Sequence, residues 1–566
     1  MKNIKKFYHA GLLALSLFLF ENSFAQTISN HFFGENAWMP DTIGDCKVCP
    51  QPPCILNGKL HQQWGAIKNS GASIIRFGGI ASDKNMPTNY QYIRMIDSVR
   101  ANGMEPIIQV PFYNYRYSAQ QAADIVKYLN VTKGKNIKYW IIANEPDLSY
   151  AYTTAAQIAN YFRPFASAMK SVDPTILIIG PEIASFNKTI MTGLTTPNGP
   201  DDITGKDGAG HYYLDVLSFH TYPFNGSQSR SDVINKLTGP GSLDDHLSFL
   251  NTRVTACNTA HGRSGASTLK TAITEANVNW QNGASDDVYG VGANSFIGGQ
   301  FWAEMMGIAL KNGVDFINFW SVMEGNSTSS NIGFCDPITH SKKPSYHHFK
   351  MMADNFKGNF VNGTTNQPTV KSFGSQSSQL TNVLILNQDQ SMSYSYTVRL
   401  NTNAVSGGST LKININAGKA NEYSDVIQSQ STVLLTFDAT GKIVKKTEYS
   451  LLGQAVASVG PIVNDFITTG VASNTIDDSN FDLKVFPNPA VDKFTVQLGH
   501  ENLLEKSFEI DVINLLGQQV FHKKADFLHG KEEVELGPSV AAGEYIVRVK
   551  DEQDNMLVKK MLLAKK

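Results

Sequence analysis

The sequence predicts an α/β fold: a (β/α)8 TIM barrel, followed by a β-sandwich and a small all-β C-terminal domain. Eight short apolar runs alternate with amphipathic segments between residues 27 and 355, as parallel strands and their crossover helices do. No glycine-rich phosphate loop follows the first run, which weighs against a doubly wound sheet. Beyond residue 356, β-branched and period-2 segments replace the helical periodicity, which is typical of an all-β region.

The eight runs are apolar or β-branched along most of their length, as strands buried on both faces should be. They are Phe32–Trp38, Ser73–Phe77, Glu105–Pro111, Trp140–Asn144, Thr175–Gly180, Val216–Tyr222, Thr271–Glu275 and Phe316–Trp320. The clearest amphipathic segments predict helices at Asn89–Asn102, Ala119–Leu129 and Ala155–Ser171. Asn102-Gly103 and Asp173-Pro174 then supply the expected helix stops.

Residues 356–460 predict the β-sandwich. Polar and apolar residues alternate over Met392–Leu400, and Ser431–Phe437 is β-branched and apolar with less regular alternation. Residues 461–480 form a polar linker, and residues 481–566 are again all-β. The strand-like runs of this last segment are Lys484–Phe486, Lys493–Leu498, Phe508–Ile513, Glu532–Leu536, Glu544–Val549 and Met556–Leu563.

The composition indicates an ordered, exported protein of several domains. A length of 566 residues corresponds to three or four domains at about 150 residues each. The chain has 48 Lys+Arg against 49 Asp+Glu, so no basic excess exists to attract nucleic acid, and we expect no nucleic-acid partner.

The N-terminus has the pattern of a signal peptide over residues 1–25. Lys2, Lys5 and Lys6 precede a short apolar run at Gly11–Phe20, and small residues stand around a cleavage point after Ala25. A buried core helix is the alternative. No later stretch reaches the 18 apolar residues of a membrane helix, so we expect no membrane span in the mature chain.

Export places the five cysteines in a compartment that permits disulfides. Cys46, Cys49 and Cys54 lie in one short segment, whereas Cys257 and Cys335 are isolated. A zinc knuckle would need a fourth ligand at matching spacing, and no second Cys-x-x-Cys exists. Local disulfides are therefore favoured over a metal site, with the pairing left open.

Two carboxylates at strand ends carry the main functional hypothesis. Glu145 and Glu275 each follow four or five apolar or small residues, which places them at the carboxyl ends of strands four and seven, where barrel active sites lie. Two carboxylates that flank one bond are the machinery of glycoside hydrolysis. The alternative is that each is a solvated surface charge.

The surrounding residues resemble those of clan A glycoside hydrolases. Tyr139–Pro146 (YWIIANEP) is similar to the clan's Asn-Glu-Pro signature, and Thr274–Asn277 is similar to its seventh-strand motif. The resemblance implies that Glu145 is the general acid/base, that Glu275 is the nucleophile, and that Asn144 contacts the sugar 2-hydroxyl.

Further positions extend this resemblance over about 330 residues. Arg76 matches the clan's arginine that supports the nucleophile, and Ser218–Pro223 matches a sixth-strand segment that holds His220 and Tyr222. The resemblance implies that Tyr222 hydrogen-bonds the nucleophile and that Trp320 forms the platform for the sugar. A satisfied core histidine is the alternative for His220.

Aromatic residues gather near the predicted mouth of the barrel, where they could stack on the apolar faces of sugars. We expect Trp38 and Tyr113 to bind substrate, although a packed loop is an equal alternative for the segment that holds Tyr113. The other aromatics are Phe112, Tyr115, Tyr117, Trp280 and Trp320.

Several other acidic residues carry no assignment. Glu35, Glu182 and Glu324 are subsite contacts or ordinary polar residues, and neither interpretation is preferred. Asp201, Asp202 and Asp207 lie in a glycine-rich loop that lacks the ordered ligands of a calcium loop, so a solvated loop is favoured.

The C-terminal segment resembles the type A sorting domain of the Bacteroidota type IX secretion system. The matching residues are Val485–Ala490, Asn514–Gln518, Gly543–Tyr545 and the final lysines Lys559, Lys560, Lys565 and Lys566. The resemblance implies the secretion machinery as a partner and export to the cell surface or medium, usually with removal of the domain. A carbohydrate-binding sandwich is disfavoured because the segment has no Trp and one Tyr.

These observations predict a secreted retaining β-glycosidase that cuts a polysaccharide or oligosaccharide by double displacement, with no cofactor and no metal. Endo action is favoured, with exo action as the alternative. A non-catalytic glycan-binding surface protein is disfavoured because both carboxylates are present. A metal-dependent hydrolase would need His-x-His ligands at strand ends, and the sequence has none there.

Overall fold

The computed structural model describes residues 26–37, 60, 63–283, 286–323, 331–337, 339–404, 411–466, 483–498, 507–514, 518–525, 531–551 and 556–564. The predicted signal peptide, Trp38, Glu324 and the clustered cysteines lie outside these residues. The chain divides into two compact units, residues 1–467 and 468–566. Within the described residues, no helix has the length and apolar character needed to cross a membrane.

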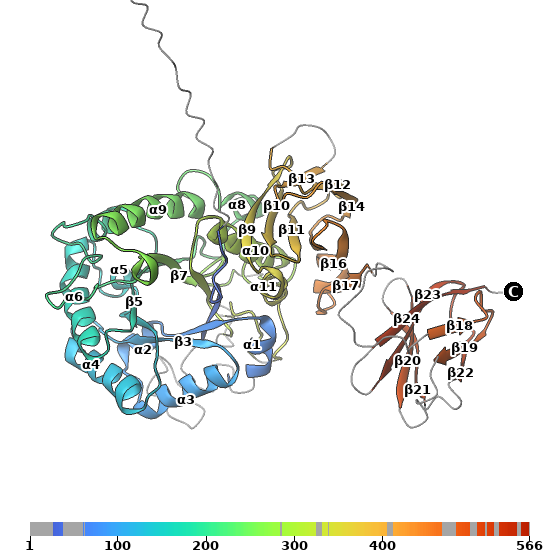
Figure 1. The fold of residues 1–566 in the computed structure, drawn as a ribbon, viewed down its shortest axis with the longest axis horizontal. Helices are drawn as coiled ribbons and strands as arrows, with labels where there is room; N and C mark the ends of the chain where they lie inside the picture. The colour runs from blue at the N-terminus through green and yellow to red at the C-terminus, as the bar shows by residue number, and fades with distance from the viewer. Residues whose placement is uncertain are drawn as a thin grey trace, which may run out of the picture. The chain divides into compact units, whose positions relative to one another are not determined.

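The first unit contains a closed barrel of eight parallel strands in chain order, seen at the left of Figure 1. The strands are β1 (Phe33–Ala37), β2 (Ile74–Phe77), β3 (Glu105–Val110), β4 (Tyr139–Ile142), β5 (Leu177–Ile183), β6 (Val216–Thr221), β7 (Lys270–Ala276) and β8 (Phe316–Phe319). Each overlaps one of the predicted apolar runs, so the predicted (β/α)8 fold is confirmed.

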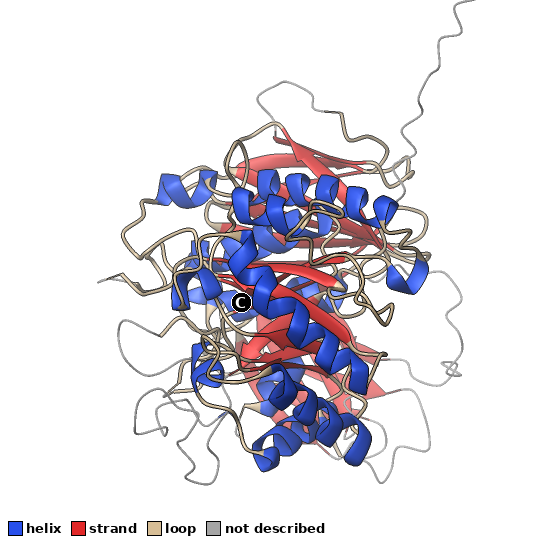
Figure 2. Ribbon diagram, turned by 90° about the vertical axis from the view of Figure 1, so that its left-hand side faces the viewer, coloured by secondary structure: helices blue, strands red, loops and turns tan. Residues whose placement is uncertain are grey.

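The helices lie outside the barrel strands, and the side view of Figure 2 shows several of them in front of the sheet. They are α1 (Trp64–Ser70), α2 (Ile80–Lys84), α3 (Asn89–Ala101), α4 (Ala119–Val126), α5 (Pro146–Ser149), α6 (Ala155–Val172), α7 (Lys188–Leu194), α8 (Arg230–Asn235), α9 (Leu243–Ala260), α10 (Phe296–Lys311) and α11 (Pro344–Asn355). Reciprocal Ser/Thr–Gln capping boxes begin α3, α4 and α6 and satisfy backbone N–H groups there.

The barrel interior holds a cluster of buried apolar side chains, one from each of seven strands. Its members are Ile74, Ile107, Ile141, Ile179, Val216, Ala272 and Phe316. Strand residues alternate between the two faces of a sheet. Residues two positions further along each strand are therefore expected to point into the barrel as well. On β2, for example, Arg76 lies two residues beyond Ile74 and also points inward.

A nine-stranded sheet in the same unit follows the barrel, in the order β14-β12-β13-β9-β10-β11-β15-β16-β17. The strands are β9 (Asn359–Thr365), β10 (Val370–Gln376), β11 (Thr381–Asn387), β12 (Tyr394–Arg399), β13 (Leu411–Ile415), β14 (Glu422–Ile427), β15 (Ser431–Phe437), β16 (Ile443–Ser450) and β17 (Ile462–Asp465). The sheet curls around its own core, to which β10 to β15 contribute, which confirms the predicted β-sandwich.

Two strands of this sheet are buried on both faces. Every residue of β11 and β15 is buried, because Val433 and Leu435 enter the sandwich core while Leu434 packs with the barrel. This double burial explains why Ser431–Phe437 lacks regular alternation in the sequence. Gln300 of α10 donates to the carbonyl oxygens of Asn387 and Ser431 at 3.1 and 3.0 Å, so the sandwich is fixed to the barrel.

The second unit is all-β, with a three-stranded sheet (β18-β19-β22) and a four-stranded sheet (β21-β20-β23-β24). The strands are β18 (Leu483–Phe486), β19 (Lys493–Leu498), β20 (Phe508–Asn514), β21 (Gln519–Ala525), β22 (Lys531–Glu535), β23 (Gly543–Asp551) and β24 (Met556–Leu563). All six predicted runs form strands. The sequence analysis missed β21 because its residues are mostly exposed and polar, so it lacks an apolar period.

We predict that acid weakens the contact between barrel and sandwich through His348. This imidazole accepts from Thr432 Oγ1 at 2.8 Å and donates to the Pro344 carbonyl oxygen, and burial lowers its pKa to about 3. An unfolded histidine has a pKa of about 6.5, so the unfolded state binds more protons as pH falls from 6.5 toward 3, and stability decreases over that range.

The measurement is the free energy of unfolding of wild type and His348→Gln at pH 7 and pH 5. Gln does not titrate, so the stability advantage of the wild type should shrink on acidification, by at most about 1.4 kcal/mol per pH unit. A difference that is the same at both pH values would contradict the prediction.

Candidate active site

The carboxyl ends of the barrel strands surround a cleft of about 680 Å³. Its polar and apolar lining comes from the segments that follow β2, β4, β5, β6, β7 and β8. The lining residues are Gly79, Ile80, Asn144, Glu145, Leu148, Ala184, Ser185, Tyr222, Glu275, Trp280, Trp320 and Ile332. Five of the predicted site residues besides the two glutamates are therefore in the cleft or beside it: Asn144, Tyr222 and Trp320 line it, and Arg76 and His220 contact Glu275.

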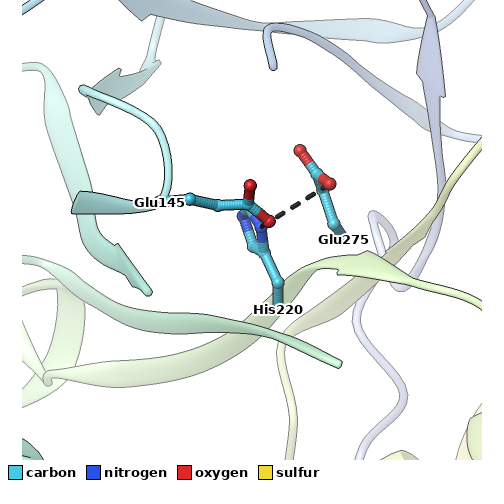
Figure 3. Close-up of side chains that lie close together, drawn as sticks. All are labelled: Glu145, His220 and Glu275. Carbon is cyan, nitrogen blue, oxygen red and sulfur yellow. Dashed lines mark hydrogen bonds and ion pairs between the residues drawn. The ribbon is translucent and has the colours of Figure 1, made fainter. Parts of the chain in front are cut away.

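The two predicted glutamates face each other across the cleft, with His220 between them (Figure 3). One oxygen of Glu145 and one of Glu275 lie within 4.8 Å of each other. Glu145 begins α5 with a left-handed backbone, φ 47°, and its amide donates to the Glu182 carbonyl oxygen at 2.9 Å. Its side chain is 16% exposed against 7% for Glu275, so Glu145 is the more accessible of the two.

Glu275 is held at both of its oxygens. Arg76 Nη1 donates to Oε1 at 2.7 Å, and the Tyr222 hydroxyl donates to Oε2 at 2.8 Å. Burial raises the pKa of Glu275 above its ordinary value, and the charges of His220 and Arg76 oppose that rise. The carboxylate is therefore fixed in position beside two cations.

His220 is a buried cation rather than a neutral core histidine. Its Nδ1 lies 3.0 Å from Glu145 and 3.5 Å from Glu275, and its Nε2 lies 3.2 Å from Glu182. Burial alone would lower its pKa, but Glu275, Glu145 and Glu182 together raise the pKa to about 10. The imidazole consequently carries a proton on each nitrogen at neutral pH.

Glu182 belongs to the site, although the sequence analysis left it unassigned. It is completely buried, and its Oε2 accepts from Arg76 Nη2 at 3.0 Å while its Oε1 accepts from Thr274 Oγ1 at 2.7 Å and from Ser218. Burial opposes its ionisation, but Arg76 and His220 lower the pKa of Glu182 to about 2. It is a permanent negative charge beneath the two facing glutamates.

Irregular strand pairing turns two of these carboxylates inward. Ile179 and Ala272 point into the barrel, so strict alternation would send Glu182 and Glu275 outward. The register of β5 and β7 shifts at these positions, and Glu182 has a left-handed φ of 60°. Such bulges re-aim side chains next to active sites.

Arg76 connects the whole group and is itself fully buried. Besides the two carboxylates, its guanidinium donates to side-chain oxygens of Asn36 (2.9 Å), Asn144 (2.9 Å) and Gln109 (3.3 Å). Asn36 and Gln109 were not predicted as site residues. Their positions at the ends of the first and third strands were the only signal in the sequence that could have indicated them.

Trp320 closes the floor of the cleft. It is 8% exposed, and a Cβ atom added to Gly79 would lie 2.9 Å from its ring, so only glycine leaves room for the indole.

Tyr113 follows β3 but is not among the residues that line the cleft. Its ring packs edge-on against the ring of Tyr150, with 6.0 Å between the ring centroids. Its role in binding stays a prediction.

Glu145, His220 and Glu275 also form a cluster whose ligand atoms are close enough for a metal ion. The donor set does not suit a metal ion, because His220 is protonated on both nitrogens and both Glu275 oxygens already accept hydrogen bonds.

In the glycine-rich loop, Asp202 accepts hydrogen bonds from the Thr204 and Asn198 amides, and Asp207 accepts hydrogen bonds from the Ala209 and His211 amides. These two carboxylates therefore hold the loop together.

Comparison with known proteins identifies the C-terminal unit. Residues 484–564 match the secretion system C-terminal sorting domain, so this part of the chain is a sorting domain, and it indicates type IX export to the cell surface or beyond. No curated protein matches the chain.

Several solved structures are similar to this chain, although only weakly. The bifunctional glucanase-xylanase CelM2 from a metagenome library is 15% identical, with a TM-score of 0.48 over 72% of this chain and 96% of that one. A Paenibacillus polymyxa xyloglucanase of glycoside hydrolase family 44 is 14% identical, with a TM-score of 0.47 over 74% and 97%. A bacterial orthologue of human α-L-iduronidase is 11% identical, with a TM-score of 0.48 over 95% and 98%.

We predict that Glu182→Gln lowers the pKa of His220, because it removes one of the charges that stabilise the imidazolium. An opposite charge at this distance raises a pKa by roughly one to three units, so a fall of that order is expected. The measurement is a pH titration of the imidazole nitrogen chemical shifts by NMR. Glu422→Gln, at an exposed carboxylate of the sandwich, is the control. An unchanged His220 titration in Glu182→Gln would refute the prediction.

Proposed function

We propose that this protein is a secreted retaining glycoside hydrolase that cleaves β-glycosidic bonds of a polysaccharide by double displacement. The observation that carries the proposal is the pair of facing carboxylates at the floor of the cleft, with oxygens within 4.8 Å. Retaining enzymes hold their carboxyl groups about 5–5.5 Å apart, whereas inverting enzymes need about 6.5–9.5 Å to admit water. The close pair supports the retaining route.

Glu275 is the proposed nucleophile. Arg76 and Tyr222 hold its two oxygens in place, and two neighbouring cations favour its ionised form. Glu145 is the proposed acid/base because it is the more exposed carboxyl and faces the cleft. Double displacement requires Glu145 to hold a proton for the leaving oxygen while Glu275 is ionised.

In the first step, Glu275 attacks the anomeric carbon while Glu145 transfers its proton to the leaving glycosidic oxygen. The carbon–oxygen bond breaks, and a glycosyl ester of Glu275 forms. In the second step, a water molecule gives a proton to Glu145 and attacks the same carbon, which releases Glu275. Two inversions at one carbon return the original configuration.

The remaining residues position the sugar. Trp320 offers an apolar ring at the cleft floor, against which the face of a sugar can stack. Asn144 accepts from Arg76 through Oδ1, which leaves its amide NH2 as the group available to a sugar hydroxyl. The proposed catalytic part comprises the barrel at residues 27–355 and the sandwich, which was predicted at 356–460 and is extended by β17 (Ile462–Asp465) into the predicted linker at 461–480.

The experiment is reducing-sugar release from β-glucans, xylan, mannan and algal galactans by wild type, Glu275→Ala and Glu145→Ala. One polymer should be cut, and each variant should lose at least about a hundredfold in rate, since general acid–base catalysis alone contributes 10²–10⁴-fold. Glu422→Ala is the matched surface control and should retain full activity.

The anomeric configuration of the first product, followed by NMR, tests the double displacement directly. Retention is expected, and an inverted product would rule out the ester of Glu275. Product sizes decide the mode of action: a spread of oligomers indicates endo cleavage, and release of one terminal unit indicates exo cleavage. If either carboxylate variant kept wild-type activity, the assigned roles would be wrong.

A further inference from the structure

Trp280 combines an exposed ring with a firmly held backbone. It lines the same cleft as Glu145 and Glu275, yet it is 55% exposed. Exposing most of an indole to water forgoes the apolar burial that normally stabilises this side chain. An exposed aromatic ring in a cleft is the kind of surface that a sugar face covers on binding.

The loop that holds Trp280 is joined to the segment that follows β6. The Trp280 amide donates to the Phe224 carbonyl oxygen at 3.2 Å, and Asn279 forms a parallel bridge with Phe224. The side chain of Gln281 donates to the Asn225 carbonyl oxygen at 3.0 Å. With hydrogen bonds on both sides, the backbone of Trp280 is fixed before any ligand arrives, so ordering it costs little on binding.

Trp280 is distinct in position from the other cleft tryptophan. Trp320 is almost buried beside Gly79, at the floor with the carboxylates, whereas Trp280 stands at the rim. Leu148, three residues beyond Glu145, is another exposed apolar side chain of the lining. The cleft volume of about 680 Å³ exceeds what a single sugar ring fills, so space for a further unit remains beside the rim.

We infer that Trp280 is a stacking platform for a sugar unit other than the one that lies on Trp320, and that the substrate is therefore an extended oligosaccharide or polysaccharide. This inference rests on the proposed glycosidase function of the same cleft. Trp280 is a specificity residue here: it contacts substrate away from the reacting carbon and favours long chains over single glycosides.

The test compares wild type, Trp280→Ala and Trp280→Phe on two kinds of substrate. The long substrates are hexasaccharides of β-1,4-glucan, xylan, mannan and algal galactan, and the short ones are the 4-nitrophenyl β-glycosides of glucose, xylose, mannose and galactose. Trp280→Ala should lower kcat/KM on the cleaved hexasaccharide at least tenfold, mainly through KM. Its ratio of hexasaccharide to aryl-glycoside activity should fall by the same factor, and Trp280→Phe should restore most of the loss.

Tyr289→Ala is the control, since Tyr289 lies on the same connection between β7 and α10, is 58% exposed, and is not among the residues that line the cleft. It should leave both activities unchanged. If Trp280→Ala cleaves the hexasaccharide as well as wild type does, the stacking platform is refuted and the glycosidase proposal stands. If wild type cleaves only aryl glycosides, the extended substrate is refuted. If wild type cleaves none of these substrates, the proposed function falls, and this inference with it.

Discussion

The buried guanidinium of Arg76 is the interaction on which the site depends. It lies within hydrogen-bond distance of Glu182 and Glu275, two carboxylates that are almost completely removed from water. Burial of an unpaired charge is expensive, and removal of one partner of a buried pair costs about 3–5 kcal/mol. Arg76, with the protonated His220, allows Glu182 and Glu275 to share one buried site, because each of these carboxylates lies beside a positive charge.

The closed barrel supplies the geometry that this charge network requires. Arg76, Glu182, His220 and Glu275 come from β2, β5, β6 and β7, strands that converge only when the sheet closes on itself. A cluster of seven buried apolar side chains, one from each of seven strands, also lies in the barrel interior. The site is therefore buried at its base, and Trp280 lies at its exposed rim.

The sandwich is a structural part of the same unit. Helix α10 is buried along nearly its whole length, because it is covered by the barrel on one side and by β11 and β15 on the other. Gly307 of α10 lies so close to the ring of Phe373 that a side chain there would collide with it. The helix that follows β7, the strand of Glu275, is thus packed on both sides.

The sequence by itself determined the architecture and the facing carboxylates. Eight apolar runs predicted eight strands, because parallel strands buried on both faces must be apolar throughout. Glu145 and Glu275 were indicated because each ends such a run, and the cleft holds both. Local patterns also found the capped helices and the sorting domain, since these depend on residues close together in the chain.

Only the tertiary structure decided which further side chains enter the site. Alternation along β5 points Glu182 outward, and a register shift with a left-handed backbone turns it inward. Such a bulge depends on how neighbouring strands stagger around the barrel, which no local period encodes. The same reason applies to Asn36 and Gln109. Both belong to the site because they accept hydrogen bonds from Arg76, which lies on another strand. The charge of His220 also depends on the tertiary structure. Three carboxylates that are distant in the sequence raise the pKa of His220, whereas burial lowers it.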